Sequence, residues 1–206
     1  AINGYLAFIG ADEYKVQLLK VQRKAFIAEN RELSAAEYKR LVNAADVGGN
    51  DRLSLVMQTI CATGIRISEL SYITVDAVKE RRMEIRLKGK SRTVIIPSKL
   101  CKKLVEYARR QRIDTGAVFR TKGGKPLDRA NVCHDMKRLC DAAHVERSKV
   151  FPHNLRHLFA RAFYSIEKNL SHLADVLGHS SIETTRIYVA ASSRQYERML
   201  DKMKLI

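Results

Sequence analysis

The chain has 206 residues, and its 38 Lys and Arg against 22 Asp and Glu give a formal net charge of +16. Such an excess favours a polyanionic partner, with nucleic acid ahead of a membrane surface. Hydrophobic residues make up 46% of the chain, which excludes a disordered basic tail, and no apolar run reaches the roughly 18–20 residues of a membrane-spanning helix.

The four cysteines, at positions 61, 101, 133 and 140, lie among apolar or helical residues, and none forms a C-x-x-C pair. This spacing contains no metal-ligand or redox motif. We therefore expect reduced, mostly buried thiols in a cytoplasmic protein, and no structural metal.

A change of pattern near the start divides the chain. Residues 1–27 carry a helical pattern and begin with "AINGYLAFIG", typical of the end of a preceding helical domain. Residues 28–33 are expected to form a linker, and residues 34–206 the main domain. Ser34 and Glu37 make a capping box, the sequence mark of a helix N-terminus.

The main domain is predicted to be mainly α-helical with one small antiparallel sheet. "DRLSLVMQTICAT" indicates a buried helix that ends at Gly64, while "MEIRL", "KGK" and "RTVIIP" predict a β-hairpin. "LCKKLVEYARRQR" has apolar residues at helical spacing, and "AVFRTKGGKPLD" predicts a short strand and a turn. Asp128 is placed to cap the next helix.

The last third of the chain is predicted to be helical. Gly178 suits the end of a short helix, and Ser180 with Glu183 predicts a capping box at the start of the helix that carries Tyr188. Residues 192–206 form a terminal amphipathic helix in this prediction. The long helix "FPHNLRHLFARAFYSIEKN" is expected to bury Leu155, Phe159, Ala162, Phe163 and Ile166.

The segment "HNLRH" places His153 and Arg156 on one helix face, where an imidazole and a guanidinium side by side suit a phosphate group. A solvated basic helix face explains the same pattern without a ligand. His153 and His157 also have the spacing of a zinc pair, but the metalloprotease motif needs Glu where Asn154 stands, and no third ligand is placed.

Two further groups of basic residues carry the same ambiguity. In "ATGIRISEL", Arg66 follows a glycine break, and Glu69 is spaced to hold its guanidinium; a simple helical ion pair is the alternative. At the hairpin tip "LKGKSR", Lys88 and Lys90 could reach a phosphate, and a charged surface turn is the alternative.

These motifs occur together in one order: "ATGIRISEL", the hairpin lysine, "HNLRHLFA", "LADVLGHSS" and "TTRIY". From Leu33 to its C-terminus the chain resembles the catalytic domain of the tyrosine recombinase, or phage integrase, family. The resemblance implies that fold. It also implies an active site made of Arg66, Glu69 as the supporting acid, His153, Arg156, His179 and Tyr188.

The family's catalytic lysine falls on one of two residues in this chain. Counted forward from "EIRL" it is Lys90, and counted back from "SRTVIIP" it is Lys88. The hairpin is shorter than the family's usual one. We take Lys90 as the prediction and Lys88 as its alternative.

The resemblance implies that DNA strands are cleaved and rejoined through a 3′-phosphotyrosyl intermediate. Arg66 and Arg156 would stabilise the charge that develops on the phosphate, and His179 would add a hydrogen bond. Tyr188 would attack phosphorus with His153 as base, and the lysine would protonate the leaving oxygen. No cofactor or metal is expected, because the guanidinium groups supply the positive charge.

The resemblance also implies partners. These are double-stranded DNA attachment sites, further copies of the chain in a homotetramer held through the C-terminal helix, and accessory DNA-bending proteins. The expected setting is the bacterial cytoplasm at the nucleoid, with no membrane contact, and the default role is integration or excision of a mobile element. The DNA target sequence is not readable from the chain.

Two other functions fit part of the sequence. "SHLADVLGHSSIETTRIYV" can form a helix-turn-helix of a non-catalytic DNA-binding protein, but that leaves Arg66, His153 and Arg156 without a role. A type IB topoisomerase-like strand transferase would use the same chemistry with a different outcome. Recombinant products rather than relaxed DNA distinguish the recombinase from that alternative.

Overall fold

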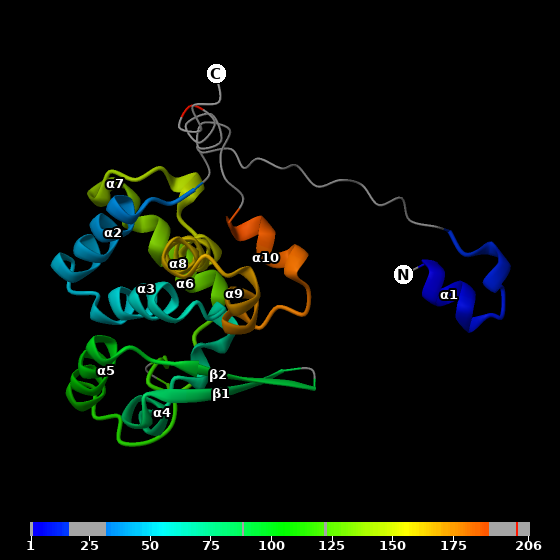
Figure 1. Ribbon diagram of the computed structural model, residues 1–206. Helices are drawn as coiled ribbons and strands as arrows, with labels where there is room; N and C mark the ends of the chain where they lie inside the picture. Colours follow the sequence, from blue (N-terminus) through cyan, green and yellow to red (C-terminus); the bar gives the residue numbers. More distant parts are fainter. Residues whose placement is uncertain (1, 17–31, 88, 122, 190–200, 202–206) are drawn as a thin grey trace.

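The computed structural model describes residues 2–16, 32–87, 89–121, 123–189 and 201. Figure 1 shows α2, α3, α8, α9 and α10 grouped together, with the β-hairpin of β1 and β2 beneath them. Across the described residues, the predicted mainly helical class with one small antiparallel sheet is confirmed.

The first described segment contains α1 (Ile2–Phe8) and the 3-10 helix η1 (Asp12–Tyr14). The Asn3 side chain joins the two, because it exchanges hydrogen bonds of 2.9 and 3.0 Å with the backbone of Val16. Neither helix has a buried residue. The helical pattern predicted for 17–27 lies outside the described residues.

The core begins at Leu33, which is fully buried although it belongs to the predicted linker. Helix α2 (Ala35–Val47) starts with the predicted capping box: the Glu37 carboxylate accepts from the Ser34 backbone at 2.8 Å, and the Ser34 hydroxyl accepts from the Glu37 backbone at 3.2 Å. This pairing satisfies two N–H groups that the helix itself leaves unbonded.

Helix α3 (Asp51–Thr63) is the central element of the core and contacts α2, α5, α6 and α8. Asn50 caps its N-terminus, and Gly64 ends it as predicted, with the left-handed φ of +67°. A Cβ at position 64 would lie 2.4 Å from the Phe159 ring, so glycine also lets α8 approach the end of α3.

The predicted hairpin is confirmed. After the 3-10 helix η3 (Ile67–Tyr72) and α4 (Val75–Glu80), strands β1 (Arg82–Leu87) and β2 (Lys90–Ile95) pair antiparallel. Met83 lies opposite Val94, and both are buried. Because side chains alternate along a strand, every second residue of β2 faces the core.

Helix α5 (Ser98–Arg110) packs on α3 and α4. The predicted short strand near residue 119 is limited to isolated bridges at Ala117 and Arg120. Asp128 caps α6 (Arg129–Arg138) as predicted, accepting from two backbone N–H groups, and α7 (Cys140–Ala143) follows. The 3-10 helix η4 (Arg147–Lys149) leads into the last part of the chain.

The last described helices are α8 (Pro152–Glu167), α9 (Leu170–Leu177) and α10 (Ile182–Val189). Figure 1 shows α10 beside α8 and α9, and all three contact one another. The prediction for the buried face of α8 holds only in part: Leu155 is buried, but Ala162 is exposed and Ile166 is 85% exposed. Helical spacing sorts residues onto faces and does not show where the packing partners end.

The start of α10 also corrects a prediction. The helix begins at Ile182, so Ser181 precedes its first residue, and the expected box of Ser180 with Glu183 is one residue out of register. The Glu183 carboxylate pairs instead with Arg186, at 3.3 Å.

The four cysteines are all described and are free thiols. Cys101 and Cys140 are buried, and Cys61 and Cys133 are partly buried, as expected. None of the helices in the described ranges is both long and apolar enough to cross a membrane.

Candidate active site

Residues far apart in the sequence converge where α8 meets α10 and the end of α3. His153 and Arg156 come from the first turns of α8, His179 from the turn between α9 and α10, and Tyr188 from the end of α10. The hydroxyl of Tyr188 lies 3.2 Å from His153 Nε2, and Arg156 Nη2 lies 2.9 Å from His179 Nε2. The structure thus brings these four predicted residues into one cluster.

Tyr188 is buried in this cluster, with 7% of its surface exposed. Its ring centroid lies 5.4 Å from the His153 ring and 5.0 Å from the His179 ring, and the Arg156 guanidinium carbon lies 5.9 Å from it. The tyrosine is therefore docked against α8 of its own chain rather than turned out to solvent.

His153 is the base in hydrogen-bond contact with the Tyr188 hydroxyl. Burial, and then the positive charge of Arg156, lower the pKa of His153 below its ordinary value. The imidazole is therefore neutral at pH 7, and its Nε2 can accept the tyrosine proton. A protonated His153 could not accept it.

Arg156 is almost fully buried, with 1% of its surface exposed, and backbone carbonyls hold its guanidinium in place. Its Nη1 donates to the carbonyl of Gly64, and its Nη2 donates to that of Leu177 at 2.8 Å. Burial lowers its pKa to about 10, so it stays charged at neutral pH. Its buried Nε has no hydrogen-bond partner among the described residues.

The hydrogen bonds of His179 fix its protonation. Arg156 can only donate, so Nε2 of His179 accepts, and the ring proton is on Nδ1, which lies 2.9 Å from the Thr185 hydroxyl. Burial, and then Arg156, lower the pKa of His179 to about 4. The family resemblance predicts a donor to the phosphate at this position; here that nitrogen is held by Arg156 instead.

Arg66 stands at the exposed edge of the cluster, with 39% of its side chain exposed. It holds the fully buried Glu69, whose carboxylate accepts from the Arg66 backbone at 2.7 Å and from its Nη1 at 3.1 Å. The predicted support of Arg66 by Glu69 is present, and Arg66 also lowers the pKa of Arg156 by its charge.

A second guanidinium completes the pairing of Glu69. Arg92 of β2 donates to both carboxylate oxygens, at 3.1 and 2.8 Å, and is itself 13% exposed. Burial alone would raise the pKa of Glu69, but the hydrogen bonds from Arg92 and from the Arg66 backbone lower it. The carboxylate is therefore ionised at neutral pH and ties the hairpin to η3.

A sequence model described as the phage integrase family matches residues 31–195. The chain belongs to this family. The match covers every described residue of the cluster, from Arg66 to Tyr188.

Named relatives agree with the phage integrase assignment. The chain is 33% identical over 183 residues to "Tyrosine recombinase XerH" of Campylobacter jejuni, covering 84% of this chain and 50% of the relative. It is 30% identical over 216 residues to "Tyrosine recombinase XerA" of Thermococcus kodakarensis, covering 100% of this chain and 73% of that protein. The chain thus spans half the length of the first relative.

The fold is that of tyrosine recombinase catalytic domains. A crystal structure of the XerH site-specific recombinase bound to palindromic difH substrate, a post-cleavage complex, matches with a TM-score of 0.74. The likeness covers 97% of this chain and 62% of that chain at 23% identity. At this identity the likeness establishes the fold of this phage integrase domain and nothing about its substrate.

The structure leaves the choice of the integrase lysine open. Lys88 lies outside the described residues, and only the backbone of Lys90 is described, paired with Leu87 at the end of the hairpin ladder. By register, position 90 falls on the same face of the hairpin as Arg92 and Val94.

Sequence reasoning missed three residues of this integrase site. Arg92 had a signal, because it stands two residues before the buried Val94 and so on the inward face of β2. His157 was considered only as a zinc ligand, whereas its ring stacks on Tyr188. Thr185 had no signal, since a threonine in a helix is unremarkable until its hydrogen bond to His179 is seen.

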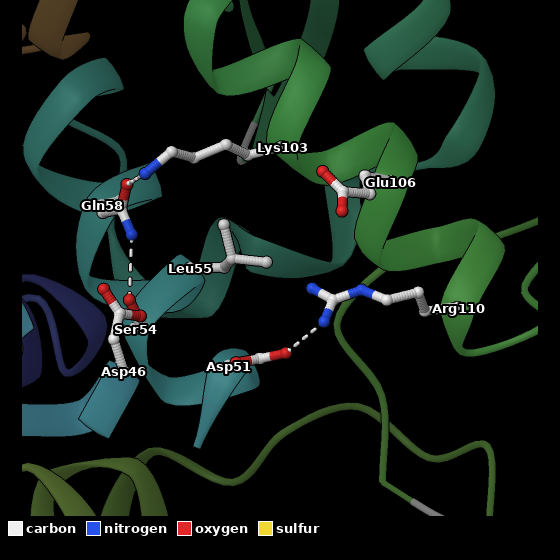
Figure 2. A pocket seen from close by; sticks show the side chains of 8 residues that line it. All are labelled: Asp46, Asp51, Ser54, Leu55, Gln58, Lys103, Glu106 and Arg110. Carbon is white, nitrogen blue, oxygen red and sulfur yellow. Dashed lines mark hydrogen bonds and ion pairs between the residues drawn. The ribbon is translucent and has the colours of Figure 1, made fainter. Parts of the chain in front are cut away.

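A groove elsewhere shares no residue with this cluster (Figure 2). It is lined by residues of α2, α3 and α5 that include acidic and basic side chains. Arg110 pairs with Asp51 at 2.7 Å, and Lys103 donates to Gln58 at 2.7 Å. The lining has three acidic side chains, Asp46, Asp51 and Glu106, against two basic ones, Lys103 and Arg110, so the groove does not favour an anion.

Proposed function

We propose that this chain is the catalytic part of a site-specific DNA recombinase that cleaves and rejoins strands through a 3′-phosphotyrosyl intermediate. The observation that carries the proposal is the buried Tyr188 hydroxyl, 3.2 Å from the neutral His153 and next to the fixed Arg156. Membership of the phage integrase family supports it. An alternative role in packing alone leaves the converging basic groups without a purpose.

In the proposed reaction, the Tyr188 oxygen attacks the scissile phosphorus as His153 Nε2 takes the phenolic proton. A phosphorus–oxygen bond forms to tyrosine, and the bond to the 5′ oxygen breaks. Arg66, which is partly exposed, and Arg156, which lies next to Tyr188, bind the non-bridging oxygens, where charge accumulates. Each such donor typically contributes about 10²–10³ in rate.

His179 acts through Arg156 in this conformation. Its Nε2 accepts from Arg156 and so orients the guanidinium. Its Nδ1–H donates to the Thr185 hydroxyl, which fixes the His179 tautomer with the proton on Nδ1. Glu69 orients Arg66 in the same way. Donation from His179 Nε2 to phosphate would require Arg156 Nη2 to turn away and Nε2 to gain a proton.

Protonation of the leaving 5′ oxygen is assigned to the hairpin lysine, Lys90 or in the alternative Lys88. DNA in which sulfur replaces the 5′ bridging oxygen distinguishes the two lysines, because a thiolate leaves without needing a proton. Replacing the lysine that acts as acid by alanine should slow cleavage of ordinary DNA and spare cleavage of the sulfur-containing DNA. Replacing the other lysine should affect both substrates alike.

Target and assembly follow from the proposed class. The substrate would be double-stranded attachment sites bound by several copies of the chain, four in the complete assembly. The predicted C-terminal contact, at residues 192–206, lies outside the described residues except for residue 201. Integration or excision of a mobile element is the proposed biological setting.

Covalent capture tests the proposal even though the target sequence is not specified. The chain is incubated with a pool of nicked duplexes that have a randomised core, so that cleavage releases a short fragment and traps the adduct. Complexes that survive denaturation are sequenced, which also reports the preferred site. We expect captured DNA with the native chain and none with Tyr188→Phe; equal capture by both chains would rule the proposal out.

Recombination is then separated from relaxation with the captured sequence. Two copies of that site are placed in one supercoiled plasmid, and the products are resolved by size after restriction digestion. Exchange between the sites supports a recombinase. Relaxation of the plasmid without exchange would support the topoisomerase-like alternative.

A further inference from the structure

His157 lies one helical turn after His153 on α8 and contacts the same tyrosine. Its ring centroid is 4.2 Å from that of Tyr188, and the two planes differ by 15°. The His153 and His179 rings meet Tyr188 at 67° and 48°. Among the described aromatic contacts of Tyr188, the stacked one is therefore made by His157.

The surroundings of His157 favour a neutral ring. Burial lowers its pKa to about 3, and the neighbouring His153, Arg161, Arg156 and His179 act in the same direction. At neutral pH the ring therefore adds no positive charge. It meets the His153 ring at 80°, with centroids 4.7 Å apart, so one α8 face carries both imidazoles against the tyrosine.

Stacking restricts the motion that matters for attack. The Tyr188 ring is attached through two rotatable bonds. The hydroxyl oxygen lies on the axis of the second bond, so a small rotation about the first bond displaces the hydroxyl, and a rotation about the second turns the plane of the ring. A flat neighbour in parallel contact resists tilting of the ring while it leaves the hydroxyl free to meet His153 and a phosphate. A misplacement of about 1 Å can cost about 10²-fold in rate.

We propose that His157 is a positioning residue whose ring face holds the Tyr188 ring in line for attack. The inference rests on the proposed role of Tyr188 as nucleophile. It assigns no proton transfer to His157, because the contact is between ring faces and the Tyr188 hydroxyl is directed to His153. What is required at position 157 is therefore a flat uncharged ring rather than a nitrogen.

Three substitutions separate these possibilities. His157→Phe keeps the flat face without a nitrogen, His157→Leu fills the space without a flat face, and His157→Ala removes both. The matched control is His172→Ala, which deletes an exposed histidine of α9 that pairs with Glu167. Each chain is assayed for the single-turnover rate of adduct formation on a captured suicide duplex, for DNA affinity and for melting temperature.

We expect His157→Phe to cleave within about threefold of the native rate, and His157→Leu and His157→Ala to be at least about tenfold slower at unchanged DNA affinity. Rates are compared well below each melting temperature, so that unfolding does not enter. If the alanine chain does not fold, the phenylalanine and leucine chains, which both fill the space, decide the matter.

Two outcomes would overturn the inference. A phenylalanine chain as slow as the leucine chain would show that the nitrogen is needed, and native rates in all three chains would show that position 157 does not matter. Failure of the proposed function gives a different result, because the adduct would then persist in Tyr188→Phe whatever the residue at 157.

Discussion

The two sides of the cluster handle charge in opposite ways. Around Tyr188, burial keeps His153, His157 and His179 neutral, since it is the largest cause of each lowered pKa. Around Glu69, burial is outweighed by hydrogen bonds from two guanidinium groups, and the carboxylate stays charged. Proton acceptors need the first environment, and groups that orient a phosphate-binding arginine need the second.

Arg156 joins the two sides. It is buried like the histidines, yet it remains charged, because its donors are held by the backbone carbonyls of Gly64 and Leu177. After burial, the charge of Arg156 is the next cause of the lowered pKa of His179, and the same guanidinium donates to the imidazole. Around Tyr188, the buried positive charge is thus carried by the guanidinium of Arg156.

The largest expected effect comes from removing the negative charge of Glu69, which pairs with Arg66 and Arg92. Glu69→Gln keeps the shape but leaves Arg92, which is 13% exposed, without its counter-ion. Loss of one partner of a buried pair typically costs about 3–5 kcal/mol, so we expect a loss of about 3 kcal/mol in the free energy of unfolding. Urea denaturation measures it.

The control for this substitution is Glu84→Gln, whose partner Arg86 is 78% exposed. That change should cost far less stability than Glu69→Gln, because a solvated surface ion pair contributes little. Equal losses in the two variants would show that the Glu69 pairing is no stronger than a surface ion pair.

A smaller effect is expected where the two sides touch. Gly178 has φ of +66°, and a Cβ there would lie 2.7 Å from the Arg92 side chain. Gly124 has a similar φ of +78° with nothing within 4 Å, so Gly124→Ala measures backbone strain alone. We expect each alanine to cost about 1 kcal/mol from strain, and Gly178→Ala to cost more by the displacement of Arg92.

Melting curves of the two alanine variants test this difference, and adduct formation reports on the site. Gly178→Ala should slow cleavage because Arg92 supports Glu69, while Gly124→Ala should not. If both variants lose the same stability, Arg92 has room to move and is not packed tightly against Gly178.

The last expected effect is a difference in pH dependence. In the folded chain the pKa of His157 is lowered to about 3 and that of His179 to about 4, whereas in the unfolded chain both have the ordinary value of about 6.5. Below about pH 6.5 the unfolded chain therefore binds more protons than the folded chain. Stability from the tyrosine side is therefore complete above about pH 6.5 and falls as pH decreases toward 4. Glu69, whose pKa is lowered, loses its contribution only below its ordinary value of about 4.3.

Denaturant unfolding at several pH values measures the loss of stability in both pH ranges, the one set by the histidines and the one set by Glu69. The chain with His157→Phe should lose less stability between pH 6.5 and pH 4.5 than the native chain does. An identical slope in the two chains would mean that His157 titrates normally and is not held neutral by its surroundings.

Much of the architecture follows from local sequence patterns. The Ser34 capping box, the helix end at Gly64, the hairpin and the Asp128 cap each depend on residues within a few positions of one another. The exposed Ile166 and the late start of α10 depend on which neighbours are present at those places, and no local pattern contains that information.

The site residues also divide into those that the sequence predicts and those that only the fold identifies. Arg66, His153, Arg156, His179 and Tyr188 were predicted as a set, and the structure brings them together around Tyr188 and Glu69. The missed residues, Arg92, His157 and Thr185, act on other site residues. The partners of these residues are set by contacts formed in the folded chain. The sequence pattern shows that Arg92 faces inward, but only the fold shows what each of the three residues contacts.

The most direct test of the proposed mechanism locates the covalent bond. The native chain is trapped on a captured suicide duplex, digested with protease and nuclease, and analysed by tandem mass spectrometry. The mechanism predicts a nucleotide joined by its 3′-phosphate to Tyr188, and no adduct in a Tyr188→Phe chain that still binds the duplex. A 5′ linkage, or a link to any other residue, would contradict it.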